Sequence, residues 1–182
     1  MTDRTSVART LDLNADLGEG VATSALDAAQ VDDALLGVVT SANVACGGHA
    51  GDAASMARVC ALAVERGVAI GAQVSYVDRA GFGRRRLDVD ARRLQEQLLE
   101  QLGELRAHAR AAGGRVAYLK PHGALYNTAA DDPEVAGVVV ATVLEDADSH
   151  RQLPVLALPG SALALRARAA GVEVVAEAFA DR

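Results

Sequence analysis

A glycine that ends a helix and is followed at once by an apolar strand recurs along this chain. The pattern is seen at Gly67, Gly114 and Gly171, where the segments GVAI, GRVA and GVEV begin. Glycine readily takes the left-handed conformation that closes a helix. Helices that alternate with buried strands indicate a parallel sheet. We therefore expect an α/β fold with parallel strands and outer helices.

The apolar pattern predicts six strands and at least four helices. The strands are expected at residues 9–16, 38–46, 68–74, 116–120, 153–158 and 172–179. Helices are expected after Asp52, along an apolar stripe from Leu94 to Ala109, after Asp132, and from Ser161 to Gly171. The Asp52 side chain suits a helix N-cap, although a role in the site is an equally open interpretation.

Composition narrows the class of protein. The chain has 182 residues, of which 51% are hydrophobic, so one core of good size can form. A net charge of −6 without an extended basic run argues against a nucleic-acid partner. Two cysteines are too few for a disulfide framework. No apolar run is long enough for a membrane span or a signal peptide, so we expect a cytoplasmic protein without a membrane partner.

Polar residues gather where the predicted strands end. In parallel α/β folds the carboxyl ends of the strands form the active site. Asp12, Asn14 and Asp16 alternate along the first strand and should share one face. Three polar groups on one face are costly in a core unless they are paired or wet. They form either a row facing substrate or metal, or hydrogen bonds to nearby loops; Glu19 faces the site or solvent.

Two histidines follow different strands in glycine-bounded loops. Neutral imidazoles such as those of His49 and His122 can bind a metal or move protons near neutral pH. Lys120 could hold a carboxylate or phosphate, or form a surface salt bridge. Cys46 is interpreted as a small packing residue. The loop before Arg84 could bind an anion, but no P-loop pattern is present, so the pattern alone predicts no ATP site in this chain.

Five segments resemble, in order, the motifs of the LamB/YcsF family. They are LDLNADLGEG (11–20), TSANVACGGHAGD (40–52), GFGRR (81–85), KPHGALYN (120–127) and FADR (179–182). The resemblance implies a (β/α) barrel-like domain over residues 11–182, related to sugar deacetylase barrels, after a polar extension at 1–10. It also implies the A subunit of a three-part enzyme that opens 5-oxoproline to L-glutamate. ATP would be a co-substrate, and the B and C subunits of 5-oxoprolinase would be partners.

The polar residues at the strand ends, together with the resemblance, give the candidate site residues. The catalytic candidates are Asp12, Asp16, His49, Lys120 and His122. The substrate-binding candidates are Asn14, Glu19, Asn43, Gln73, Arg84, Asp181 and Arg182. A divalent metal is left open; its ligands would come from Asp12, Asp16, His49 and His122. We hypothesise that Lys120, His122 and Arg182 stabilise charge and that Asp12 or Asp16 activates water.

The sequence departs from the family in two places. The family usually has a histidine where this chain has Gln73, and an amide cannot act as a base. The family also normally continues beyond the FADR motif, so we expect a C-terminally incomplete, open barrel that could self-associate. Two other functions therefore stay open: a stand-alone metal-dependent amide or sugar-ester hydrolase, and a non-catalytic binding or scaffold protein.

Overall fold

A single parallel sheet organises the protein. The computed structural model describes residues 11–146 and 152–179, and within them six strands lie in the order β1-β2-β3-β4-β5-β6. The strands are β1 Asn14–Leu17, β2 Ser41–Ala45, β3 Ala69–Val74, β4 Val116–Pro121, β5 Val155–Ala157 and β6 Val174–Ala176. The helices are α1 Ala28–Leu36, α2 Ala53–Arg66, α3 Ala91–Ala111, α4 Gly123–Asp131, α5 Pro133–Glu145 and α6 Ala162–Ala169. The expected α/β class is confirmed.

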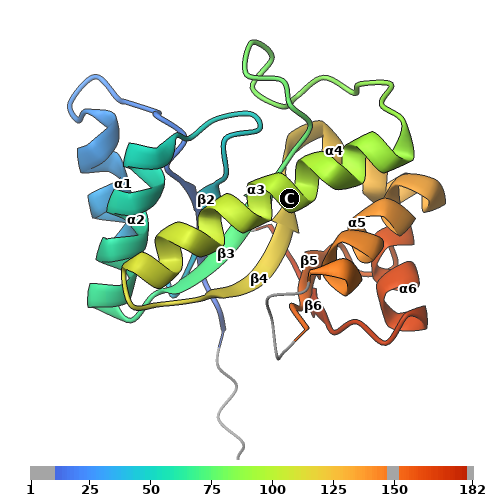
Figure 1. Cartoon of the computed structure of the whole chain (residues 1–182). Coiled ribbons are helices and arrows are strands. Elements are labelled where there is room, and N and C mark those ends of the chain that lie inside the picture. Colours follow the sequence, from blue (N-terminus) through green and yellow to red (C-terminus); the bar gives the residue numbers. More distant parts are fainter. Residues whose placement is uncertain (1–10, 147–151, 180–182) are drawn as a thin grey trace, which may run out of the picture.

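The main hydrophobic core lies between the sheet and the helices on its outer side (Figure 1). Helices α1, α2, α3, α5 and α6 pack in this order, each against the next. On the face of the sheet that is turned toward these helices, one row of fully buried apolar side chains crosses five neighbouring strands. The row consists of Leu17, Val44, Ala72, Leu119 and Val155. Because side chains alternate along a strand, the adjacent positions face the other side of the sheet, where the polar residues lie.

On the other face of the sheet, the Tyr118 side chain of β4 extends across the neighbouring strand β3. Asp16, Asn43, Gly71 and Tyr118 follow one another in register from β1 to β4. Gly71 has no side chain, and a β-carbon there would overlap the Tyr118 ring. The ring therefore lies over β3, and the Tyr118 hydroxyl donates to Asn43 Oδ1 at 2.7 Å. This glycine lets a residue of β4 hold a side chain of β2.

The helix ends follow the sequence closely. The Asp52 carboxylate accepts from the backbone N–H of Ser55 at 2.8 Å and caps α2, so the helix-cap interpretation is confirmed. Gly67 ends α2 in the left-handed conformation, with φ 69° and ψ 23°. Asp132 caps α5 as expected.

Several details differ from the sequence prediction. Strands β2, β5 and β6 are shorter than the predicted 38–46, 153–158 and 172–179. Helices α1 and α4 were not expected, although Asp27 and Gln30 form a capping box at the start of α1. The first strand is shorter than the predicted 9–16 and begins at Asn14. Its ladder begins late because the Leu13 N–H donates to the side chain of Thr40 at 2.8 Å, in place of a backbone carbonyl.

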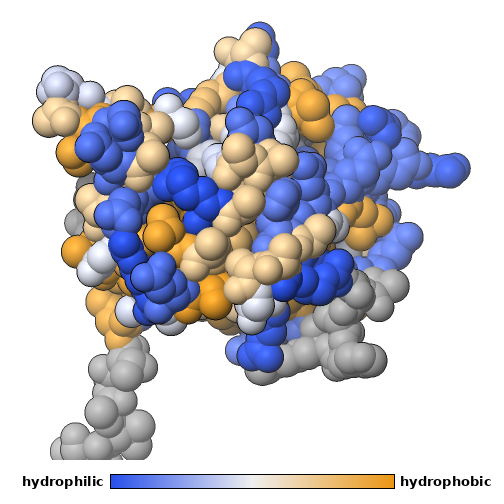
Figure 2. Space-filling model, turned by 60° about the vertical axis from the view of Figure 1, so that its left-hand side comes forward, coloured by the Kyte–Doolittle hydropathy of each residue, from blue (hydrophilic) through white to orange (hydrophobic). Residues whose placement is uncertain are grey.

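The two edges of the sheet are β1 and β6, which each pair with only one described strand. Figure 2 shows the side of the molecule on which α1 and α2 lie; hydrophilic and apolar surface are mixed there, with apolar side chains gathered in the lower left. Near the β1 edge, the Leu11 side chain is 91% exposed and that of Leu13 is 53% exposed. None of the described helices is both long and apolar enough to span a membrane.

Candidate functional site

Two stacked imidazoles form the centre of the site. The rings of His49 and His122 lie 3.7 Å apart between centroids and 10° from parallel, and both residues are buried. His49 follows β2 and His122 follows β4, so the sheet brings them together. Phe82 packs edge-on against both rings. The neighbouring Gly83 has φ +65°, and a β-carbon there would come within 2.7 Å of His49 Cβ, so glycine permits this close packing.

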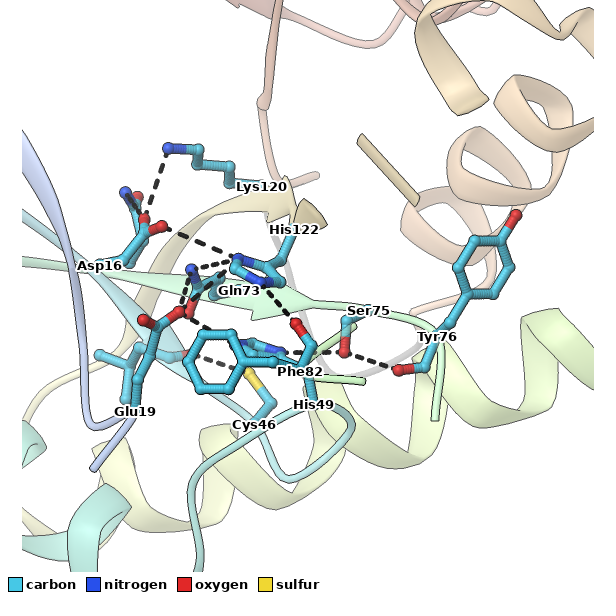
Figure 3. A network of polar contacts seen from close by, with 12 residues as sticks. Asp16, Glu19, Cys46, His49, Gln73, Ser75, Tyr76, Phe82, Lys120 and His122 are labelled. Carbon is cyan, nitrogen blue, oxygen red and sulfur yellow. Dashed lines mark hydrogen bonds and ion pairs between the residues drawn. The ribbon is translucent and has the colours of Figure 1, made fainter. Parts of the chain in front are cut away.

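Glu19 points into the same centre (Figure 3). Its Oε1 atom lies 3.0 Å from His49 Nε2 and 3.6 Å from His122 Nδ1. The buried Gln73 donates from Nε2 to Glu19 Oε1 at 3.0 Å and contacts His122 Nδ1 at 2.9 Å. Gly18 and Gly20 flank the carboxylate residue with φ of 73° and 74°. This left-handed turn directs Glu19 inward. Of the two positions left open by the sequence, Glu19 therefore faces the site and not the solvent.

The outer hydrogen bonds assign a proton to each imidazole. The Ser75 hydroxyl donates to the Tyr76 carbonyl at 3.0 Å, so His49 Nδ1 carries the proton that it shares with Ser75 Oγ at 3.0 Å. His122 Nε2 lies 3.2 Å from the Phe82 carbonyl, which only accepts, so this nitrogen carries the proton. With the protons placed in this way, His49 Nε2 and His122 Nδ1 are the ring nitrogens free to bind a metal, and both lie beside Glu19 Oε1.

This arrangement fits a divalent metal. One ligand atom each from Glu19, His49 and His122 all lie within 4.8 Å of one another. Ligands about 2.1 Å from a tetrahedral zinc ion lie roughly 3.4 Å apart, close to the separations seen here. Metal-binding histidines also commonly donate their second N–H to an outer acceptor, as both rings do. Of the four ligands expected from sequence, His49 and His122 are brought together, and the carboxylate grouped with them is that of Glu19, not of Asp12 or Asp16.

A second group of charges adjoins the histidines. Lys120 Nζ lies 2.7 Å from Glu177 Oε1, 3.5 Å from Asp16 Oδ1 and 3.4 Å from Asn14 Oδ1. Asp16 Oδ2 in turn lies 3.8 Å from His122 Nδ1. Lys120 is buried, so its expected alternative role in a surface salt bridge is wrong. A continuous polar chain thus runs from β6 through β4 and β1 to the histidine centre.

The surroundings of Asp16 and His49 set their charge. Burial acts to raise the pKa of Asp16. The contact with His122, the charge of Lys120 and a hydrogen bond from Asn43 outweigh burial and lower this pKa to about 2. Burial also lowers the pKa of His49 from its usual 6.5, and this effect outweighs the nearby Glu19 carboxylate, which acts to raise it. At neutral pH the site therefore holds a firmly ionised Asp16 and a neutral His49.

The polar row predicted on the first strand is confirmed. Asp12 Oδ1 accepts from the Ser41 hydroxyl at 2.6 Å. Asn43 Nδ2 donates to Asn14 Oδ1 at 2.7 Å and to Asp16 Oδ1 at 2.9 Å. Asp12 lies at the start of this row and contacts β2, whereas Asp16 lies at its end beside the histidines. The hydroxyl groups of Thr40 and Ser41 thus satisfy Asp12 at the opposite end of the row from Glu19.

The remaining predicted residues divide into three groups. The Arg84 guanidinium lies over the Phe82 ring, with Cζ 5.3 Å from the centroid, and so borders the site from outside. Cys46 is buried, and burial raises the pKa of its thiol, which agrees with a packing role. Asp181 and Arg182 lie outside the described residues.

Sequence reasoning missed several residues that build this site. They are Ser75, Phe82, Tyr118 and Glu177. Alternation from Gln73 through Ser75 would have placed Ser75 on the inner face. Glu177 follows β6 by one position, but the prediction for that strand considered only its apolar residues.

Three cavities surround the site. The β4 cavity, of about 560 Å³, is bordered by Asp16, Lys120, His122 and Tyr126. The β1–β6 cavity, of about 520 Å³, lies along Asp12 and Asn14 and meets Lys120, Glu177 and Phe179. The loop cavity, of about 290 Å³, lies beside Glu19, His49 and Arg79. Small molecules can therefore approach the polar chain from more than one direction.

The parallel strands, the outer helices and the polar site at the strand ends define an α/β protein of the (β/α) barrel type. The chain belongs to the LamB/YcsF family, whose sequence model matches residues 11–182. It is 60% identical over 173 residues to a Streptomyces avermitilis protein named as the A subunit of 5-oxoprolinase. A Mycobacterium avium protein of the same name is 55% identical over 173 residues.

Both alignments cover 94% of this chain, which spans 66% of the length of either relative. Among solved structures, the lactam utilization protein from Thermus thermophilus superposes with a TM-score of 0.86 at 37% identity. That match covers 96% of this chain and 68% of the solved one.

Proposed function

We propose that this chain acts as the A subunit of an ATP-dependent 5-oxoprolinase, which opens 5-oxo-L-proline to L-glutamate. The observation that carries the proposal is 60% identity over 173 residues to a relative named as the 5-oxoprolinase A subunit. The similarity to a solved lactam utilization protein also supports a cyclic amide as substrate. The relatives' names do not favour a stand-alone hydrolase or a non-catalytic scaffold.

The proposed chemistry needs groups that stabilise charge beside a carbonyl. A lactam amide is stabilised by resonance, and phosphorylation of its carbonyl oxygen by ATP would make it a better electrophile. Negative charge then develops on oxygen, where a fixed cation or N–H donor lowers the barrier. Lys120 borders the β4 cavity and is placed to serve as such a donor, whereas the Nε2 proton of His122 is already donated to the Phe82 carbonyl.

The surroundings of each carboxylate indicate a different role for it. A group with a pKa of about 2, such as Asp16, is a weak base at neutral pH. We assign Asp16 to holding Lys120 and His122 in position. Glu19 and neutral His49 are better placed to accept a proton or to bind a metal. Asp12, Asn14 and Asn43 support the row that positions Asp16.

We also propose that a divalent metal is held by Glu19, His49 and His122. A bound metal would supply a Lewis acid for a carbonyl oxygen or for water. The grouping of one ring nitrogen from each histidine with the Glu19 carboxylate supports this assignment. Gln73 Oε1 is buried without a hydrogen-bond partner among the described atoms, and rotation of this amide would direct an oxygen toward the same centre.

The proposal includes two further partners, the B and C subunits, with ATP as co-substrate of the complex. The test is ATP-dependent release of glutamate from 5-oxoproline by this chain alone, by the other two subunits, and by all three together. We expect turnover only from the complete set, and a large loss with His122→Ala. Steady turnover by this chain alone would contradict the partner requirement, and no turnover by the complete set would contradict the function.

A further inference from the structure

The carboxylate of Glu177 has an unexplained oxygen atom. The side chain is only 4% exposed, and its Oε1 atom lies 2.7 Å from Lys120 Nζ. Its Oε2 atom is buried and has no hydrogen-bond partner within the described part of the chain. Burying a charged oxygen without a partner is unfavourable, and nearly all such atoms in folded proteins are paired. A ligand that donates a hydrogen bond would complete Glu177.

Lys120, beside this carboxylate, makes one short contact and two long ones. An ammonium group has three N–H donors. The contact with Glu177 is short, whereas those with Asn14 and Asp16 are long, at 3.4 Å and 3.5 Å. Lys120 and Glu177 both border the β1–β6 cavity of about 520 Å³, together with Phe179. An acceptor and a donor therefore lie side by side at a cavity large enough for a single-ring molecule.

This pair matches one edge of a lactam. The ring of a five-membered lactam forces its amide into the cis form, so the N–H and the C=O point to the same side. Such an edge offers one donor next to one acceptor. An open-chain trans amide directs these groups to opposite sides, and a lactone has no N–H at all.

We propose that Glu177 and Lys120 bind the cis-amide edge of the lactam substrate. Glu177 Oε2 accepts the ring N–H, and Lys120 Nζ donates to the ring carbonyl. The carbonyl then lies next to Asp16 and within reach of the histidine centre, which Asp16 approaches at 3.8 Å. The inference rests on the proposed 5-oxoprolinase function and names the residues that recognise the N–H.

The first test compares two ligands on the unaltered chain by calorimetry. The ligands are 5-oxo-L-proline and the matching lactone acid, in which a ring oxygen replaces the N–H. We expect the lactam to bind at least about tenfold more tightly, because the lactone leaves Glu177 unpaired. Binding of the lactam without any preference over the lactone would overturn the inference and leave the proposed function standing. Failure of the chain to bind either ligand would contradict the inference, whereas the proposed function is decided by the turnover test on the assembled subunits.

The second test assigns the preference to Glu177 with Glu177→Gln. Lys120 only donates, so the glutamine must turn its oxygen toward Lys120 and its NH₂ group toward the ring. This orientation opposes the lactam N–H and suits the lactone oxygen, so the preference should vanish or reverse. Glu173→Gln, an exposed position just before β6, should keep the preference. Should Glu177→Gln fail to fold, the comparison of lactam and lactone on the unaltered chain remains the deciding test. A preference retained in Glu177→Gln would overturn the assignment.

Discussion

His49 and His122 lie with their rings stacked 3.7 Å apart, although 72 intervening residues separate them in the sequence. Two imidazolium rings at this distance would repel each other, so the arrangement favours at least one neutral ring. The structure agrees, because burial and the neighbouring His122 both lower the pKa of His49. The stack is therefore a feature of the site near neutral pH and weakens when both rings are protonated.

The first prediction concerns stability against acid. The folded-state pKa of His49 lies below 6.5, so between that value and pH 6.5 the unfolded chain binds more protons than the folded one. The contribution of His49 to the free energy of unfolding should thus be fully present above pH 6.5, and the stability should fall as the pH drops below this value. Urea unfolding from pH 7.5 to pH 5 measures this slope. His49→Gln should flatten it, whereas His108→Gln on α3 should not; equal slopes in all three proteins would contradict the assignment.

Asp16 contributes in the same direction at lower pH. Its pKa is about 2 in the folded protein against a usual 3.8. Its stabilising contribution is therefore present above pH 3.8 and is lost as the pH falls through about 2. The variant Asp16→Asn should lose this part of the acid dependence. A variant with an unchanged unfolding curve between pH 4 and pH 2 would show that Asp16 is not held by His122 and Lys120.

The second prediction tests the metal centre. The purified chain should bind one divalent ion such as Zn²⁺, measured by metal analysis after dialysis. His49→Ala should abolish this binding, since a ligand is lost. Ser75→Ala removes only the acceptor of the His49 Nδ1 proton and should weaken metal affinity by about 10–100-fold. His108→Ala provides the control. Equal metal content in His49→Ala and the unaltered chain would rule out the proposed ligand set.

The third prediction concerns the contact between Gly71 and Tyr118. A β-carbon at position 71 would overlap the ring, so Gly71→Ala should lower the free energy of unfolding by about 1–3 kcal/mol. Gly103 makes the matched control: it lies on the exposed side of α3 with open space around it. Gly103→Ala should instead stabilise the protein by roughly 0.5–1 kcal/mol. Denaturant unfolding of the two variants should give opposite signs, and a neutral Gly71→Ala would contradict the packing.

The fourth prediction concerns Gln73, where the family usually has histidine. If an imidazole at this position moves protons, Gln73→His in the enzyme assembled with its partners should raise turnover, by up to about 100-fold. Gln95→His on α3 serves as the control for a new histidine elsewhere. An unchanged or lower rate would mean that position 73 acts by orientation, as the hydrogen bonds from Gln73 to Glu19 and His122 suggest.

Local rules were enough to predict much of this protein from sequence. The alternation of glycine-ended helices and apolar strands indicated the parallel α/β class, and the caps at Asp52 and Asp132 marked two helix starts. Period-two alternation also placed Asp12, Asn14 and Asp16 on one face. These features depend on residues close together in the chain, so their chemistry can be seen without a fold.

The make-up of the site was decided by the tertiary structure. The turn at Gly18 and Gly20 made Glu19, not Asp12, the carboxylate that meets the histidines. Glu177 reaches Lys120 because the curvature of the sheet brings the end of β6 opposite β1 and β4. Alternation fixes which face a side chain occupies, but not how far along the strand it lies from a partner on another strand. That distance depends on register and curvature, which are set by the packing of the whole sheet against its helices.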